Sequence, residues 1–170
     1  MTDQPLRHSE REVRDPAAID RIIQVTNVCR VGFVDAGEPY VVPLNFGFAA
    51  GSGSAADAFW FHSATSGRKA QLLRAEPRVC VQLEEDLGLV THAEKACSWT
   101  QSYRSVMAWG NARVARDRDE ARHGLDVLMR QHADRDGWTY SDAILDHTLV
   151  WCVEVDRITA KEHIAKGDDA

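Results

Sequence analysis

The sequence has 170 residues, the usual length of one globular domain, and 44% of them are hydrophobic and 27% charged, as in soluble proteins. Lysine and arginine number 20 against 26 aspartates and glutamates, which gives a formal net charge of −6 at pH 7. A net acidic surface disfavours nonspecific attachment to nucleic acid or to anionic membranes. We therefore expect neither as a partner, and we expect any bound anion to be held by a local basic cluster.

The sequence carries no sign of export or of a membrane span. Its polar start is not followed by an apolar stretch, and no run approaches the roughly 20 apolar residues that cross a bilayer. The cysteines are widely scattered and form no CxxC pair or zinc spacing. These features predict a reduced cytoplasmic protein without a metal site.

Taken in chain order, the pattern predicts an N-terminal arm over 1–14, a single domain over 15–165 and a polar tail over 166–170. Helical spacing predicts three helices, over 16–26, over 67–75 and from about 118 onward. Alternating or continuous apolar residues predict six strands, at 28–34, 39–48, 58–63, 78–84, 102–115 and 149–155.

Hairpin-like loops join most of these strands, and strands do not alternate regularly with helices. The pattern therefore favours a mainly β fold with peripheral helices, a small antiparallel barrel, over a doubly wound parallel sheet. Pro43 lacks an N–H group, so its strand should lie at an edge or contain a bulge. The acidic stretch Glu84–Asp86 is interpreted as a solvated turn.

The segment FWFHSATSGRKAQLL, residues 59–73, is typical of an anion-binding turn. A strand ends at His62 and Ser63, and Gly67-Arg68-Lys69 opens a helix whose N–H groups and partial positive charge suit a phosphate. The alternative is a solvated basic helix start with Ser66 as its cap.

Two further segments bring polar groups that can bind a ligand. Arg104 and Ser105 lie on a predicted strand, where alternation sends their side chains to opposite faces. The segment Val42–Phe46 pairs a strand proline with Asn45, which both donates and accepts hydrogen bonds. Such a strand offers backbone groups to a planar polar ring, and the alternative is an ordinary edge strand with a bulge.

In order and spacing, the segments VVPLNFGF, FHSATSGRKAQLLRAEPRVCVQLE and YRSVMAWGNARV resemble the FMN-binding split β-barrel of the pyridoxamine 5′-phosphate oxidase-like superfamily. They are most similar to its nitroimidazole-resistance (Nim-type) branch. The resemblance implies a six-stranded antiparallel split barrel that forms a homodimer with FMN at the interface.

The resemblance also implies roles for individual residues. The flavin ring edge would lie along Pro43, Leu44 and Asn45, and the ring and ribityl chain near His62 and Ser63. The phosphate would be held by Gly67, Arg68 and Lys69, with Arg104 and Ser105 completing the site. Unlike the true pyridoxamine phosphate oxidases, the chain lacks a C-terminal tryptophan-and-arginine segment, which argues against vitamin B6 oxidation.

His62 is the candidate catalytic residue, because a neutral imidazole beside a flavin can donate a hydrogen bond or relay a proton. The alternative is a histidine that only packs at the strand end. The leading hypothesis is an FMN-dependent oxidoreductase that reduces a small electron-poor substrate, in the manner of a nitroreductase. The alternatives are a flavin-storage protein without turnover, or a split barrel that binds haem or a deazaflavin.

Overall fold

The computed structural model describes residues 7–92, 95–133 and 135–165. The chain divides into two compact units. Unit 1 comprises Met1–Thr26, Leu83–Met107 and Thr159–Ala170, and unit 2 comprises Asn27–Gln82 and Ala108–Ile158. The predicted tail and residues 1–6 of the predicted arm lie outside the described residues, and a single domain over 15–165 stays a prediction.

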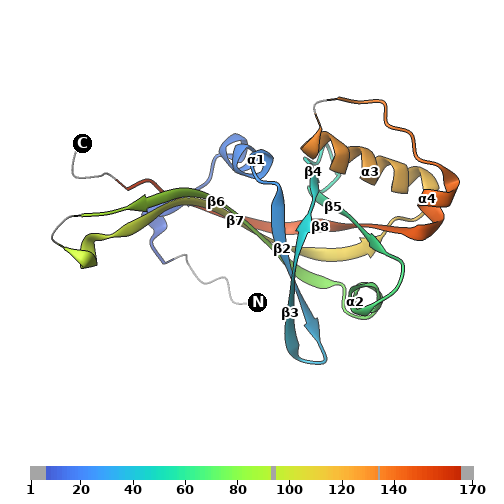
Figure 1. Cartoon of the computed structure of the whole chain (residues 1–170), viewed down its shortest axis with the longest axis horizontal. Helices are drawn as coiled ribbons and strands as arrows, with labels where there is room; N and C mark the ends of the chain where they lie inside the picture. The colour runs from blue at the N-terminus through green and yellow to red at the C-terminus, as the bar shows by residue number, and fades with distance from the viewer. Residues whose placement is uncertain (1–6, 93–94, 134, 166–170) are drawn as a thin grey trace. The chain divides into compact units, whose positions relative to one another are not determined.

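The described residues form four α-helices: α1 (Pro16–Gln24), α2 (Arg68–Ala75), α3 (Arg118–His132) and α4 (Asp142–His147). Two single-turn 3₁₀ helices cover Ser9–Arg11 and Ala96–Ser98. The strands are β1 (Glu12–Val13), β2 (Val28–Asp35), β3 (Glu38–Asn45), β4 (Gly47–Ala49), β5 (Ala58–Ala64), β6 (Arg78–Val90), β7 (Thr100–Val114) and β8 (Thr148–His163) (Figure 1).

These strands form one sheet in the order β3-β2-β6-β7-β8-β5-β4, and β1 pairs with β8 off this path. Each strand pair of known register is antiparallel. Because β3 and β4 stand at the two ends of the order, the sheet formed by the described residues is not closed. The predicted class, a mainly antiparallel β fold of the split-barrel type with helices at its periphery, is confirmed.

The sheet has eight strands rather than the six predicted. One addition is the two-residue β1, which is too short to produce an alternation. The other arises because the predicted strand 39–48 is two strands, β3 and β4, interrupted at Phe46. At this break the Phe46 side chain is fully buried and its ring lies 5.5 Å from that of Phe59.

Unit 2 is built around large buried side chains from its strands. Trp151 and Phe61 stack with their ring centroids 4.2 Å apart, and Phe33 lies against Trp151. Helix α3 packs on β4 and β5 (Figure 1). Gly47 permits this approach, because a Cβ atom there would lie 2.5 Å from the Cα atom of Leu128 in α3.

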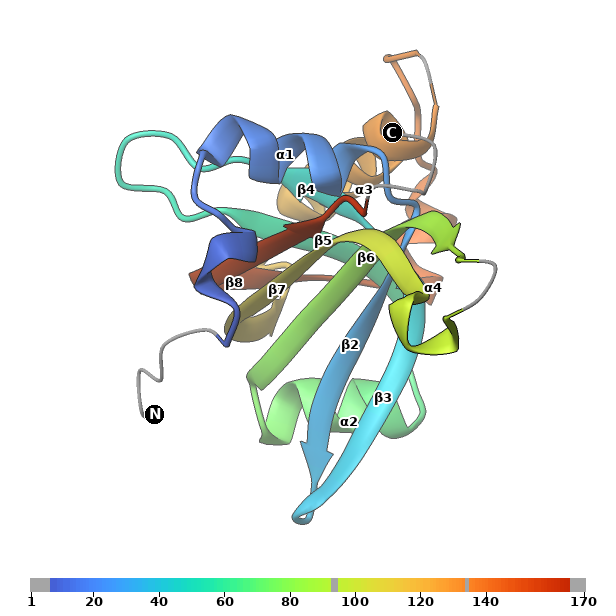
Figure 2. The ribbon, with the colours of Figure 1, turned by 90° about the vertical axis from the view of Figure 1, so that its left-hand side faces the viewer.

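The β2–β3 hairpin and α2 are neighbours within unit 2 (Figure 2). All eight residue pairs from Val28–Asn45 to Asp35–Glu38 are in register, and a two-residue turn with positive φ at Ala36 and Gly37 closes the hairpin. Helix α2 buries Ala70, Leu72 and Leu73. This packing fixes where α2 begins, which positions the candidate site.

Unit 1 contains α1, β1 and parts of the three long strands. Asp15 caps α1 by accepting a hydrogen bond of 3.2 Å from the Ala17 N–H group, as the Asp15-Pro16 pair predicts. The helix buries Ile19, Ile22 and Ile23. None of the helices in the described part of the chain is long and apolar enough to cross a membrane.

Three further predictions about the elements were wrong. Glu84–Asp86 is not a turn, because β6 continues to Val90 and Glu85 pairs with Arg104 of β7 at 3.0 Å. The last strand does not end at 155, because β8 continues to His163 with Lys161 opposite Glu12 of β1. A fourth helix, α4, is present and is capped by the Ser141 hydroxyl.

Candidate functional site

The N-terminus of α2 is open to a ligand. Of the four α-helices in the described residues, α1, α3 and α4 are capped by the side chains of Asp15, Asp117 and Ser141, whereas α2 has no side-chain cap. The proposed alternative, a cap from Ser66, is therefore not what the structure shows. The first-turn N–H groups and the positive end of the helix dipole remain available to an anion.

Gly67 gives the turn its backbone conformation. Its φ of 104° lies in the region that favours glycine, and a Cβ atom there would meet no heavy atom within 4 Å. The position that a side chain would take at Gly67 is therefore open, and the glycine leaves the backbone exposed there.

Arg68, the first residue of α2, is held against the β2–β3 hairpin. Its Nε donates a hydrogen bond of 2.5 Å to Oδ2 of Asp35, and its guanidinium lies 4.3 Å above the ring of Tyr40. Because the ion pair is partly exposed to solvent, it adds little stability, on the order of 0–1 kcal/mol. Its effect is to orient the guanidinium, and within the described residues the two terminal nitrogens have no acceptor and can bind another one.

Lys69 and His62 form a second pair of basic groups. Partial burial lowers the pKa of Lys69, and partial burial together with the charge of Lys69 lowers the pKa of His62. His62 is therefore a neutral imidazole at pH 7. In the part of the chain that the structure describes, Lys69 has no acidic partner, so a bound anion would offset the cost of desolvating its charge.

The lowered pKa of His62 has a definite effect on stability. A histidine that binds its proton more weakly in the folded state destabilises that state once it is protonated. This contribution is absent above the ordinary value of 6.5, grows as the pH falls from 6.5 toward the lowered value of the folded state, and levels off below that value. Acidification therefore weakens the fold around His62.

Pro43 lies on β3, which stands at one end of the sheet order, so its predicted edge position is confirmed. It pairs with Arg30 of β2 and is exposed. Leu44 is half-buried, and the exposed Asn45 donates from Nδ2 to the Asn27 carbonyl oxygen at 3.0 Å. That bond fixes the amide and leaves its oxygen as an acceptor.

Ser63 follows His62 at the end of β5 and is half-buried. Its hydroxyl lies 3.4 Å from the Ala64 carbonyl oxygen, a long and weak hydrogen bond. The hydroxyl can therefore turn to a ligand at little cost. Unit 2 thus contains Pro43, Leu44, Asn45, His62, Ser63, Gly67, Arg68 and Lys69, eight of the ten residues predicted for the site.

Arg104 and Ser105 belong to unit 1, on β7. The Arg104 guanidinium binds two carboxylates, with Nε 2.5 Å from Glu162 and Nη1 3.0 Å from Glu85, and these bonds raise its pKa. Its positive charge is therefore already matched. Ser105 is half-buried, and alternation along β7 directs it to the other face. Their roles in holding a flavin stay predictions.

Sequence reasoning missed the carboxylates that engage these arginines. Asp35 and Glu85 lie 33 and 19 residues from Arg68 and Arg104, and Glu162 lies 58 from Arg104. The sequence shows only that Glu85 directly follows the residues of a predicted strand. The pairing register between strands is needed to show that its carboxylate meets Arg104.

Together, these features define an antiparallel split barrel that presents an uncapped, basic helix N-terminus beside an edge hairpin. The sequence profile of the pyridoxamine 5′-phosphate oxidase family matches residues 15–162. The chain belongs to this family. No curated protein matches the chain significantly in sequence.

Several solved structures are similar to this chain. A candidate 5-nitroimidazole antibiotic resistance protein from Bacteroides thetaiotaomicron is 34% identical, with a TM-score of 0.74 over 88% of this chain and 85% of that one. The FAD and heme binding protein of Mycobacterium smegmatis is 19% identical, with a TM-score of 0.77 over 94% and 77%. The flavocytochrome Anf3 of Azotobacter vinelandii is 20% identical, with a TM-score of 0.75 over 99% and 78%. The last two similarities show the shared fold.

Proposed function

We propose that this chain is an FMN-dependent oxidoreductase that reduces a small electron-poor substrate, such as a nitroaromatic compound, with electrons from a reduced nicotinamide. The observation that carries the proposal is the N-terminus of α2, where an uncapped helix start coincides with Gly67, Arg68 and Lys69. The 34% identity to a candidate 5-nitroimidazole resistance protein supports the substrate class.

The residues of unit 2 fit a flavin that ends in a single phosphate. Arg68 offers two terminal nitrogens, Lys69 offers a cation without an acidic partner among the described residues, and the α2 amides supply further donors. The edge strand at Pro43–Asn45 has exposed positions for the polar rim of the ring. FMN would supply the hydride and electron chemistry, and the chain would bind and orient it.

His62 is proposed to hold the proton that the reaction needs. Its imidazole is neutral at pH 7 because burial and Lys69 lower its pKa, so its ring N–H can donate a hydrogen bond. A proton held there is available to a substrate that gains negative charge during reduction. Partial burial and, to a smaller extent, the charge of Lys69 keep the imidazole neutral, so its N–H group is in place at neutral pH.

We further propose that the functional unit is a cytoplasmic homodimer. In unit 1, Leu89 on β6 and Trp99 just before β7 are 56% and 51% exposed, and a second copy would cover such apolar side chains. All four cysteines are free, as expected in a reducing compartment. Sedimentation equilibrium of the purified protein should give twice the chain mass.

Turnover is tested anaerobically with the protein-bound flavin as the reporter. Reduced nicotinamide should bleach the flavin, and a nitroaromatic compound should restore its colour. The His62→Gln variant should retain FMN and slow the recovery by roughly 10²-fold, the lower end of what a proton donor contributes. A protein that holds FMN but is not bleached, or is not reoxidised, is a flavin carrier rather than this enzyme.

Lys69 should show a trade-off between stability and binding. Replacing it with Met keeps the length of the side chain but removes a charge that burial disfavours. We expect the flavin-free variant to melt at a higher temperature than the parent protein and to bind FMN at least about tenfold more weakly. Differential scanning calorimetry and fluorescence titration measure the two effects. Lower stability with unchanged FMN affinity would contradict the assigned role.

A further inference from the structure

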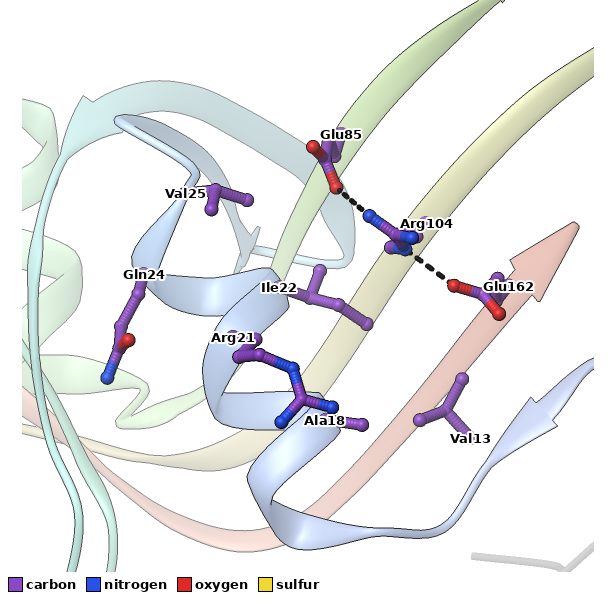
Figure 3. A pocket seen from close by; sticks show the side chains of 9 residues that line it. All are labelled: Val13, Ala18, Arg21, Ile22, Gln24, Val25, Glu85, Arg104 and Glu162. Atoms are coloured by element: carbon purple, nitrogen blue, oxygen red, sulfur yellow. Dashed lines mark hydrogen bonds and ion pairs between the residues drawn. The ribbon is translucent and has the colours of Figure 1, made fainter. Parts of the chain in front are cut away.

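Unit 1 contains a cavity of about 340 Å³ that none of the predicted flavin roles explains, except that Arg104 borders it (Figure 3). Its walls are α1, β1 and the strands β6, β7 and β8, and every residue that lines it belongs to unit 1. This volume is at the lower end of the range for small-molecule pockets, which is about 300–1,000 Å³. The nature of its walls indicates what would fit.

The sheet side of the cavity has an excess of negative charge. Glu85, Arg104 and Glu162 lie in a row across β6, β7 and β8, with the guanidinium between the two carboxylates (Figure 3). Each carboxylate uses Oε2 for Arg104, and its Oε1 has no hydrogen bond within the described ranges. Two carboxylates against one guanidinium leave one negative charge and two acceptor oxygens for a ligand with N–H donors.

The helix side of the cavity has an excess of positive charge. Arg21 extends from α1 beside Ala18 (Figure 3), and among the residues described by the structure it has no acidic partner. A guanidinium is a strong donor to carboxylate groups. The cavity therefore has an unmatched positive charge on one wall and an unmatched negative charge on the other.

Between the charged groups the lining is apolar. Ile22 is 3% exposed and its side chain points from α1 toward Arg104, and Val13 faces it from β1 (Figure 3). Val25 at the end of α1 is 59% exposed, a high value for a valine that borders a cavity. An apolar group placed here would cover surface that is now in contact with water.

We propose that this cavity binds a free amino acid with an apolar side chain. The ammonium group would bind Glu85 and Glu162, the carboxylate would bind Arg21, and the side chain would lie against Ile22 and Val25. A simple anion would satisfy Arg21 and face two carboxylates, whereas a simple cation would satisfy the carboxylates and face Arg21. Only a ligand with both charges matches both walls. The proposal is independent of the proposed function.

The test uses isothermal titration calorimetry of the whole protein with L-leucine as the probe. Leucinamide lacks the carboxylate charge and N-acetyl-leucine lacks the ammonium charge, so each should bind at least about tenfold more weakly than L-leucine. The Arg21→Gln variant should weaken L-leucine binding by a similar factor. Arg74→Gln, which removes an exposed arginine of α2 in unit 2, should leave it unchanged.

A second variant separates loss of binding from loss of folding. Ala18→Leu adds bulk to the α1 wall of the cavity without breaking the helix, because leucine is a good helix former. It should abolish L-leucine binding and keep the circular dichroism spectrum of the parent protein. No binding of L-leucine to the parent protein, or equal binding of leucinamide, would overturn the proposal.

Discussion

Replacing Arg68 and Lys69 together by alanine is expected to weaken FMN binding by about 10²–10⁴-fold. A hydrogen bond to a charged group typically contributes about 1.5–3 kcal/mol, so two such contacts amount to roughly 3–6 kcal/mol. The variant also leaves Asp35 without the guanidinium that it binds at 2.5 Å, so an unpaired carboxylate would lie near the flavin phosphate. Fluorescence titration of the flavin-free protein with FMN measures the change.

The matched control for this variant is Arg74→Ala. Arg74 is exposed in the last turn of the same helix, and the proposed phosphate site does not include it. The control should bind FMN as the parent protein does, since it removes one positive charge from α2 without touching its N-terminus. Equal affinity of the double variant and the control would show that the phosphate is held elsewhere.

The second large effect concerns stability. Trp151 is fully buried on β8 and stacks on Phe61 with an angle of 18° between the rings. Truncating a large buried aromatic side chain leaves a cavity that the surrounding residues fill only in part. Trp151→Ala should therefore lower the free energy of unfolding by about 3–5 kcal/mol, measured by urea denaturation followed by circular dichroism.

Two variants show that burial and stacking cause this loss. The Nε1–H group of Trp151 is buried and has no acceptor in the described part of the chain. Trp151→Phe removes this unsatisfied donor and retains an aromatic ring, so it should cost much less than the alanine variant. Ile144→Ala removes a 52% exposed isoleucine of α4 and should change stability by less than about 1 kcal/mol. Similar losses for Trp151→Ala and Ile144→Ala would contradict the account.

Local signals in the sequence predicted much of the fold. Asp15-Pro16 marked the start of α1, and Asp117 marked the start of α3, because a capping carboxylate acts on N–H groups only two or three residues away. The edge position of Pro43 also followed from its own chemistry, since proline lacks the N–H group that a central strand needs.

The wrong predictions concern residues whose interaction partners are distant in sequence. The pattern predicts a turn at Glu85 because three acidic residues in a row are usually solvated. Its carboxylate instead binds Arg104 on the neighbouring strand. Glu162 also lies in a polar stretch, yet β8 continues through it to His163 and the Glu162 carboxylate binds Arg104. Charged residues enter a strand when a cross-strand partner matches them, and only the register supplies that partner.

The candidate site shows the same division between local features, which the sequence predicts, and long-range contacts, which it does not. Gly67-Arg68-Lys69 was evident from residue types alone, because a glycine before two basic residues at a helix start is a local arrangement. The ion pair of Arg68 with Asp35 and the contact of Arg68 with Tyr40 were not evident from residue types, since they depend on how α2 lies against the β2–β3 hairpin. The sequence therefore predicted the basic groups but not the groups that orient them.

The central claim, that the N-terminus of α2 holds a flavin phosphate, is tested most directly by titrating the flavin-free protein with FMN and with riboflavin. The two ligands share the ring and the ribityl chain and differ only in the phosphate. We predict that FMN binds at least about 100-fold more tightly, because in the proposed site Arg68, Lys69 and the α2 amides would contact only the phosphate. Equal affinities, or no binding of FMN, would contradict the claim.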